Sequence, residues 1–197
     1  MDVPLSMGQI KAAQILHERL ISWKTTDQAL QDLARRFNEF DSVSVLIKVA
    51  TLNQLYGTNV YAVTRMAEHV TKVMAEKPAA TPDLVDRLAS LPKAPGQQSQ
   101  RNHLSFASKF AHFFIDSEVF PIYDSYAAKM LAYHLRREVE CNKECPYEAF
   151  VSNFKRLRER AHLSCTTREL DRYLWLAGLY LKFQKDHKAK INVDARK

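Results

Sequence analysis

Glycine is scarce in this chain, at 4 of 197 residues, and runs of alternating β-branched and polar residues are rare. Sheets need such alternation, with turn-forming residues between their strands, so these shortages argue against a β-protein. No apolar run approaches the roughly 20 residues that span a bilayer. The opening residues MDVPLSMGQ carry no apolar signal segment. We therefore expect an all-α, cytoplasmic protein that does not cross a membrane.

Metal ligands and nucleotide-binding motifs are also missing. The chain has three cysteines, Cys141, Cys145 and Cys165, and no fourth ligand lies at a spacing typical of zinc or iron–sulfur sites. An odd number of cysteines suits a reducing compartment better than a disulfide framework. GxGxxG, P-loop, HExxH and GxSxG sequences are all absent. We expect neither a metal nor a cofactor.

What is present is a substantial apolar content and a basic charge. The chain is 46% apolar and 10% aromatic, enough for a folded core, and its formal charge is +7. Residues 1–100 carry 11 basic and 10 acidic residues, whereas residues 101–197 carry 18 and 12. The excess of basic residues is therefore C-terminal, which suits an anionic partner there. A merely soluble basic protein is the alternative.

Apolar residues recur with helical spacing along the whole chain, which we treat as one helical unit, 1–197. Residues 42–49, SVSVLIKV, could also form a strand, but the pattern continues to residue 55 without alternation. Thr26, Thr58 or Asn59, Thr81 and Thr166 or Thr167 are plausible N-caps. We expect about nine helices, over residues 8–23, 27–40, 42–55, 60–76, 83–91, 103–114, 125–137, 147–161 and 167–185.

The helix expected over residues 103–114 is almost wholly apolar except for one narrow stripe. Ser105, Ser108, Lys109 and His112 follow one another at i, i+3, i+4 and i+7, so they share a face. This stripe is either a solvent-exposed face or the wall of a groove that holds a polar ligand. Asp124 then begins the helix over residues 125–137, where an aspartate is an ordinary N-cap.

Two stretches together resemble the helix–hairpin–helix DNA glycosylase superfamily, and most of all its prokaryotic 8-oxoguanine DNA glycosylase-like branch. The first is LIKVATLNQLYGTNVYAVTRMAEHV, residues 46–70. The second contains LPKAPGQQSQR, which is similar to an LPGVG-type hairpin, and FPIYDS, which is similar to the segment that presents the family's catalytic aspartate. The resemblance covers residues 33–133, about half of the chain.

The resemblance implies a two-lobed helical architecture with a cleft between the lobes, and basic helices over residues 134–197 that pack back on the core. It also implies a monomer that binds double-stranded DNA and flips one base into a pocket. The pocket would contain Ser105, Ser108, His112 and Tyr123. The DNA-binding residues would be Asn53, Gln54, Tyr56, Gly57, Thr58 and Asn59 in the loop that fills the gap, and Lys93, Gly96, Gln97, Gln98, Ser99, Arg101, Asn102 and His103 around the hairpin.

The chemistry implied is cleavage of an N-glycosidic bond, in which Asp124 stabilises the positive charge on the sugar or orients a water. Bifunctional members carry a lysine just after the hairpin glycines, and residues 97–102 contain none. We therefore expect a monofunctional hydrolase, with a glycosylase and lyase that uses Lys109 as the alternative. The substrate implied is 8-oxoguanine or a hypermodified base such as those of phages.

Two hypotheses from other classes remain open at this stage. The chain could be a non-catalytic DNA-binding module that keeps the fold. The similarity around FPIYDS could also be accidental, in which case Asp124 is only a helix cap in a helical interaction protein.

Overall fold

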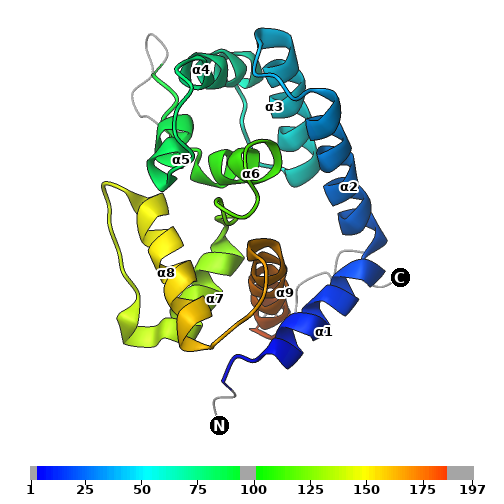
Figure 1. Ribbon diagram of the computed structural model, residues 1–197, viewed down its shortest axis with the longest axis vertical. Helices are drawn as coiled ribbons and strands as arrows, with labels where there is room; N and C mark the ends of the chain where they lie inside the picture. The colour runs from blue at the N-terminus through cyan, green and yellow to red at the C-terminus, as the bar shows by residue number, and fades with distance from the viewer. Residues whose placement is uncertain (1–3, 94–100, 186–197) are drawn as a thin grey trace.

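A computed structural model describes residues 4–93 and 101–185. Within those ranges the regular secondary structure consists of helices alone, which confirms the all-α fold (Figure 1). The helices are α1 (Met7–Arg19), α2 (Ile21–Arg36), α3 (Ser42–Tyr56), α4 (Val63–Ala75), α5 (Pro82–Ala89), α6 (Leu104–Phe114), α7 (Ser125–Leu135), α8 (Pro146–Arg160) and α9 (Thr167–Lys185), with a short 3-10 helix at Arg136–Glu138.

The helices gather into two groups joined by α2. Figure 1 shows α3, α4, α5 and α6 at one end of the molecule and α1, α7, α8 and α9 at the other. Within the groups α3 packs on α4, α5 on α6, and α9 on both α7 and α1, while α8 connects the groups by packing on α5 and α7. One continuous cluster of buried side chains, from Ile10 in α1 to Leu174 in α9, runs through both groups.

The first two helices meet at a different place from that expected. The predicted N-cap, Thr26, lies inside α2, and the chain instead bends at Leu20, where φ is −84° and ψ is 78°. The bend has a tertiary cause, since α1 packs on α9 whereas α2 continues toward α3 and α6. No glycine or proline marks the bend, so local sequence signals misplaced it.

The turn after α3 is organised by one amide side chain. Asn53 accepts hydrogen bonds from the Thr58 hydroxyl at 2.8 Å and the Val60 N–H at 2.9 Å, and donates to the Val60 carbonyl at 3.1 Å. Gly57 takes the left-handed conformation, with φ at 56°, that commonly ends a helix. These bonds keep residues 58–62 out of the helix, so α4 begins at Val63, and neither Thr58 nor Asn59 is its N-cap.

Other helix starts follow the sequence signals. Thr81 precedes α5 with Pro82 in its first turn, and Pro146 opens α8. Thr166 and Glu169 bond each other's backbone N–H groups at the start of α9, as in a capping box.

Gly178 sets how closely α9 approaches the start of α7. A Cβ added there would lie 2.7 Å from the Cβ of Tyr126 and 2.8 Å from its carbonyl oxygen. We expect Gly178→Ala to lower the free energy of unfolding by about 1–3 kcal/mol, since backbone must move to relieve the contact.

Thermal denaturation of Gly178→Ala tests this contact, with Gly8→Ala in α1 as the matched control. A Cβ at Gly8 meets nothing nearer than the Ser6 hydroxyl at 3.7 Å, so that variant should be as stable as the natural protein or more so. Equal stability of the two variants would contradict the account of the α7–α9 contact.

Candidate active site

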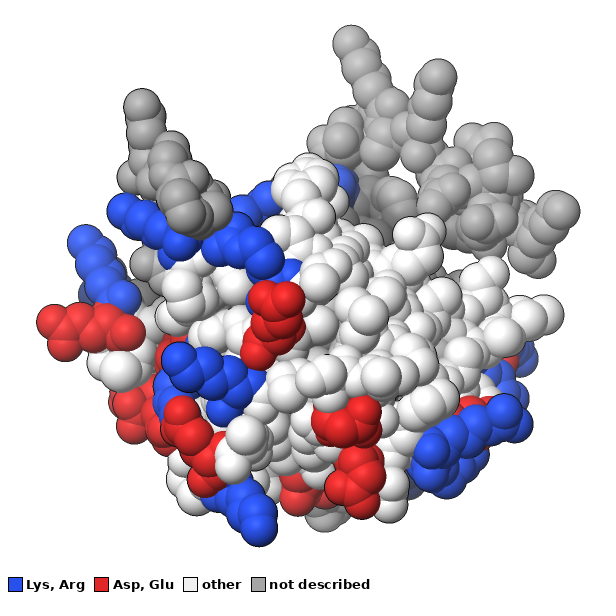
Figure 2. All heavy atoms as spheres, turned by 90° about the horizontal axis from the view of Figure 1, so that it is seen from above, with Lys and Arg blue, Asp and Glu red and all other residues white. Residues whose placement is uncertain are grey.

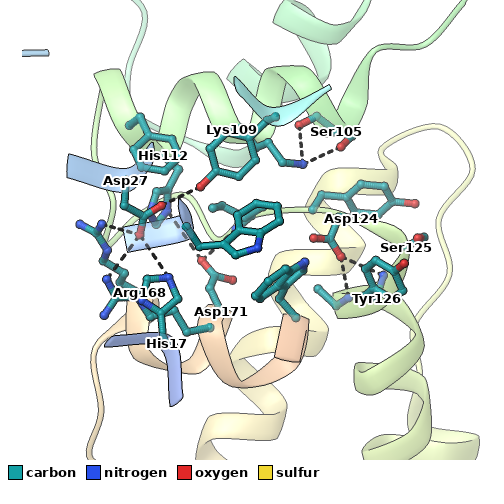
Figure 3. Close-up of a pocket in the computed structure, with 18 of the residues that line it drawn as sticks. His17, Asp27, Ser105, Lys109, His112, Asp124, Ser125, Tyr126, Arg168 and Asp171 are labelled. Atoms are coloured by element: carbon teal, nitrogen blue, oxygen red, sulfur yellow. Dashed lines mark hydrogen bonds and ion pairs between the residues drawn. The ribbon is translucent and has the colours of Figure 1, made fainter. Parts of the chain in front are cut away.

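A pocket of about 580 Å³ lies where α2, α3 and α6 of one side meet α1, α7 and α9 of the other. This volume is within the range of small-molecule sites. Figure 3 shows Lys109, Ser105 and Asp124 toward one end of the pocket, with Asp27, His17 and Arg168 toward the other. Its lining residues are His17, Trp23, Asp27, Tyr56, Gly57, Ser105, Lys109, His112, Phe113, Ile122, Tyr123, Asp124, Ser125, Tyr126, Ala127, Arg168, Asp171, Arg172 and Trp175.

Asp124 is the residue immediately before α7, and it lines the pocket. One oxygen of its carboxylate, Oδ1, accepts the N–H groups of Tyr126 and Ala127, both at 2.8 Å, so the aspartate caps the helix as predicted. Both of these cap bonds use the same oxygen. Capping therefore leaves the second oxygen, Oδ2, available to a ligand in the pocket.

Lys109 reaches the same end of the pocket from α6. Its side chain is buried, and Nζ donates to the Ser105 hydroxyl at 2.7 Å and to the Ser105 carbonyl at 3.3 Å. Burial lowers the pKa of Lys109, and the charges of Asp124 and Asp171 offset part of that shift. A buried amine with a lowered pKa supplies more of the neutral form that can act as a nucleophile.

His112 and Asp171 form the buried side of the pocket between its two ends. Nδ1 of His112 lies 2.9 Å from the Phe120 carbonyl, which can only accept, so this nitrogen carries the proton. Burial lowers the pKa of His112 to about 4, so the ring is neutral near pH 7. Burial also raises the pKa of Asp171 well above its usual value. Oδ2 of Asp171 accepts the Ile122 N–H at 3.0 Å, while buried Oδ1 has no partner among the described residues.

A hydrogen-bonded network around Asp27 closes the other end. The carboxylate accepts the Tyr56 hydroxyl at 2.7 Å and the Arg168 guanidinium at 2.8 Å, with Arg172 at 3.4 Å and His17 Nε2 at 3.7 Å. Burial by itself raises the pKa of Asp27, but the bonds from Arg168 and Tyr56 bring it below its ordinary value. Asp27 is therefore an ionised, fully engaged anchor for this end of the pocket.

Aromatic rings form much of the apolar wall. Trp23 and Trp175 have ring centroids 4.5 Å apart, and Trp23 meets Tyr56 edge-on at 6.0 Å. Tyr56 in turn packs on Phe113 at 5.6 Å. Such a wall suits a flat ring with apolar faces and polar edges, because the faces stack on aromatic side chains while the edges reach the polar groups beside them.

Three of the four residues in the polar stripe on α6 line this pocket, and the stripe is not a solvent-exposed face. Lys109 is 5% exposed, His112 3% and Ser108 0%, which excludes a solvent-exposed face. Ser105, Lys109 and His112 line the pocket together with Tyr123, as the groove interpretation predicts. Ser108, also predicted for the base pocket, does not line it: its hydroxyl instead accepts the Tyr123 N–H at 3.0 Å.

The predicted loop after α3 has few free side chains. Asn53 and Thr58 bond within the loop, and Tyr56 is held by Asp27 inside the pocket, which Gly57 also lines. Gln54 and Asn59 are exposed. The most exposed large apolar residue nearby is one that sequence analysis did not select, Tyr61, at 85% exposure, and the Arg101 guanidinium lies 5.5 Å from its ring centre.

The predicted hairpin is only partly described. Gly96, Gln97, Gln98 and Ser99 lie outside the described residues. Lys93, Arg101 and Asn102 are exposed, and His103 is half-buried just before α6.

On the described surface, basic residues lie beside acidic ones. Arg156 and Arg160 of α8 pair with Glu140 and Glu138. Figure 2, which views the end of the molecule where α3 and α4 lie, shows neutral side chains over the centre and both signs of charge around the rim.

Among the described residues no group of three or more His, Cys, Asp or Glu side chains is placed to hold a metal. Over the same residues, no helix has the length and apolar character needed to cross a membrane.

Comparison with known proteins gives a family and one weak relative. Residues 9–118, more than half of the chain, match the family model HI_0787_N, described as an N-terminal domain. A Haemophilus influenzae strain Rd protein named "Uncharacterized protein" is 27% identical over 144 residues. That match covers 68% of this chain and 66% of the relative, just under two thirds of its length. No solved structure matches the chain significantly.

Proposed function

This chain belongs to the HI_0787_N family, and from its pocket we propose that it is a DNA glycosylase that removes a damaged or modified base from duplex DNA. The observation that carries the proposal is that Lys109 and Asp124 line one pocket with the Trp23–Trp175 pair. A carboxylate, an amine of lowered pKa and an aromatic wall are groups that suit cleavage of a nucleoside. The resemblance around FPIYDS selects this reaction from others that such groups could support.

In this proposal the base lies against the aromatic wall and the sugar lies toward Lys109 and Asp124. Breaking the glycosidic bond leaves positive charge on the sugar, which the free oxygen of Asp124 stabilises. Asp171, which lines the pocket between its two ends, would bond an edge of the base. The helix groups on either side of the pocket would then be the two lobes of a helix–hairpin–helix glycosylase.

The burial of Lys109 favours the lysine as nucleophile over direct attack by water. The absence of a lysine at residues 97–102 is an argument for water, but Lys109 occupies the pocket wall and its pKa is lowered by burial. Its amine would attack C1′ as the base leaves with the bonding electrons and gains a proton. The attacking nitrogen then loses one proton, and cleavage of the C1′–O4′ bond, with O4′ taking up a proton, gives an iminium ion between Lys109 and C1′.

The DNA partner is proposed from the resemblance and from the pocket. The face drawn in Figure 2 carries charges of both signs and does not add to that argument. Tyr61 and Arg101 are the exposed pair best suited to contact nucleic acid near the turn after α3, through stacking and charge. The substrate we propose is 8-oxoguanine or a hypermodified base.

Tryptophan fluorescence gives a direct test of base entry, because the chain has only two tryptophans and both line the pocket. We expect a duplex that carries a substrate base to shift or quench the emission. The same duplex without that base should bind with little effect, since the pocket stays empty. The measurement is a fluorescence titration alongside fluorescence anisotropy of labelled DNA.

The same titration separates the glycosylase from a non-catalytic DNA-binding module. Such a module would bind all the duplexes, with strong dependence on salt, and would leave the tryptophan emission unchanged. That result, together with no base release, would overturn the proposed function.

A further inference from the structure

The segment that carries Asp124 into the pocket has no regular secondary structure. Residues 120–124 connect the region after α6 to the start of α7 and lie outside any helix or strand. Phe120 and Pro121 are buried and residues 122–124 are half-buried, so the backbone polar groups here need partners within the protein. The position of Asp124 therefore depends on whatever holds these residues.

Four side chains form hydrogen bonds with the backbone of four consecutive residues of the segment, 120–123. His112 donates to the Phe120 carbonyl at 2.9 Å, and Asp171 accepts the Ile122 N–H at 3.0 Å. Ser108 accepts the Tyr123 N–H at 3.0 Å, and the Tyr147 hydroxyl donates to the Pro121 carbonyl at 2.7 Å. These four contacts, the 120–123 clamp, come from helices α6, α8 and α9.

Within the 120–123 clamp, Tyr147 and Ser108 differ from the other two because they do not line the pocket. Tyr147 is 0% exposed and belongs to α8, which contributes no pocket residue. Burial raises the pKa of Tyr147, so its hydroxyl stays protonated and donates at any pH at which the protein would be assayed. Its ring also packs on Phe150, with centroids 6.1 Å apart, a contact that phenylalanine would keep.

We infer that Tyr147 is a positioning residue for the proposed reaction: through the Pro121 carbonyl it fixes the path of the segment that places the Asp124 carboxylate in the pocket. The inference rests on the proposed function and adds a residue to it that touches neither base nor sugar. Tyr147 acts three residues before Asp124, and Ser108 acts one residue before it by holding the Tyr123 N–H.

Tyr147→Phe removes the hydroxyl and keeps the ring, so the Pro121 carbonyl loses its partner. Small displacements of a catalytic group cost rate steeply. We expect the single-turnover rate of base release to fall by about 10- to 100-fold, while the dissociation constant for the same duplex changes less than about twofold, since no pocket group is altered. Tyr180→Phe is the matched control, because that tyrosine is 61% exposed on α9.

A second measurement does not depend on turnover. Hydrogen exchange of the Tyr126 and Ala127 amides, which Asp124 caps, should become faster in Tyr147→Phe and stay unchanged in Tyr180→Phe. Ser108→Ala should have the same two effects, and it serves if Tyr147→Phe does not fold.

The outcomes separate this inference from the proposed function. Faster exchange at the cap amides without any base release by the natural protein would overturn the proposed function and, with it, the positioning role of Tyr147 in that reaction. Base release by the natural protein that continues at full rate in Tyr147→Phe or Ser108→Ala would overturn the inference alone. A purely structural role predicts a lower melting temperature with an unchanged rate well below that temperature.

Discussion

Replacing Asp124 by asparagine is expected to slow base release by about 10²- to 10⁴-fold while the start of α7 remains intact. Asparagine keeps a side-chain oxygen that can accept the N–H groups of Tyr126 and Ala127, and it caps helices about as well as aspartate. What it lacks is the negative charge that would stabilise the cationic sugar in the proposed reaction. The measurement is the single-turnover rate on a modified duplex.

The matched control for this variant is Asp41→Asn. Asp41 caps α3 in the same way, through the N–H groups of Val43 and Ser44, and it does not line the pocket. Both variants should have nearly the natural stability, whereas Asp124→Ala should lose about 1 kcal/mol as a lost cap. Full activity of Asp124→Asn would mean that Asp124 is only a helix cap.

Lys109→Gln is expected to abolish the covalent intermediate. If Lys109 attacks C1′, borohydride reduces the iminium ion and links the natural protein to the DNA, and the variant gives no such adduct. The rate of base release should also fall by about 10²-fold or more, because the nucleophile is gone. Gel electrophoresis after borohydride treatment measures the adduct.

Lys129→Gln provides the control, since Lys129 is an exposed lysine on α7 and its loss should leave the adduct unchanged. Base release without any adduct in the natural protein would restore direct attack by water, with Asp124 as its partner. An adduct that persists in Lys109→Gln would place the nucleophile on another residue.

The rate should also depend on pH in a way that identifies Lys109. Only the neutral amine attacks, so the rate should rise with pH until it passes the pKa of Lys109, which burial holds below the ordinary value. The charge of Asp124 raises that pKa, so Asp124→Asn should move the rise to lower pH.

The sequence predicted the helices well because most of them are amphipathic and begin with clear caps or prolines. It also predicted that Asp124 and the stripe of Ser105, Lys109 and His112 share a site, because helical spacing and the FPIYDS segment are local features. It misplaced the bend at Leu20, which depends on α1 packing against α9.

The half of the pocket contributed by distant helices could not be predicted in the same way. Trp23, Asp27, Arg168 and Trp175 come together only through the packing of α2 and α9. One signal was present for Asp171: it shares a helical face with Leu174 and Trp175, where a carboxylate is unusual unless it has a buried role. Tyr61 and Tyr147 are ordinary aromatic residues in the sequence, and only exposure in one case and a buried bond in the other distinguishes them.

The most direct test of the central claim is a search for free bases. The protein would be incubated with duplex DNA that carries 8-oxoguanine and with genomic DNAs of several modification types, and released bases would be identified by mass spectrometry. The account predicts that one modified base is released by the natural protein and by Asp41→Asn, but only at a small residual rate by Asp124→Asn and Lys109→Gln. No release from any of these DNAs, or equal release by all four proteins, would contradict it.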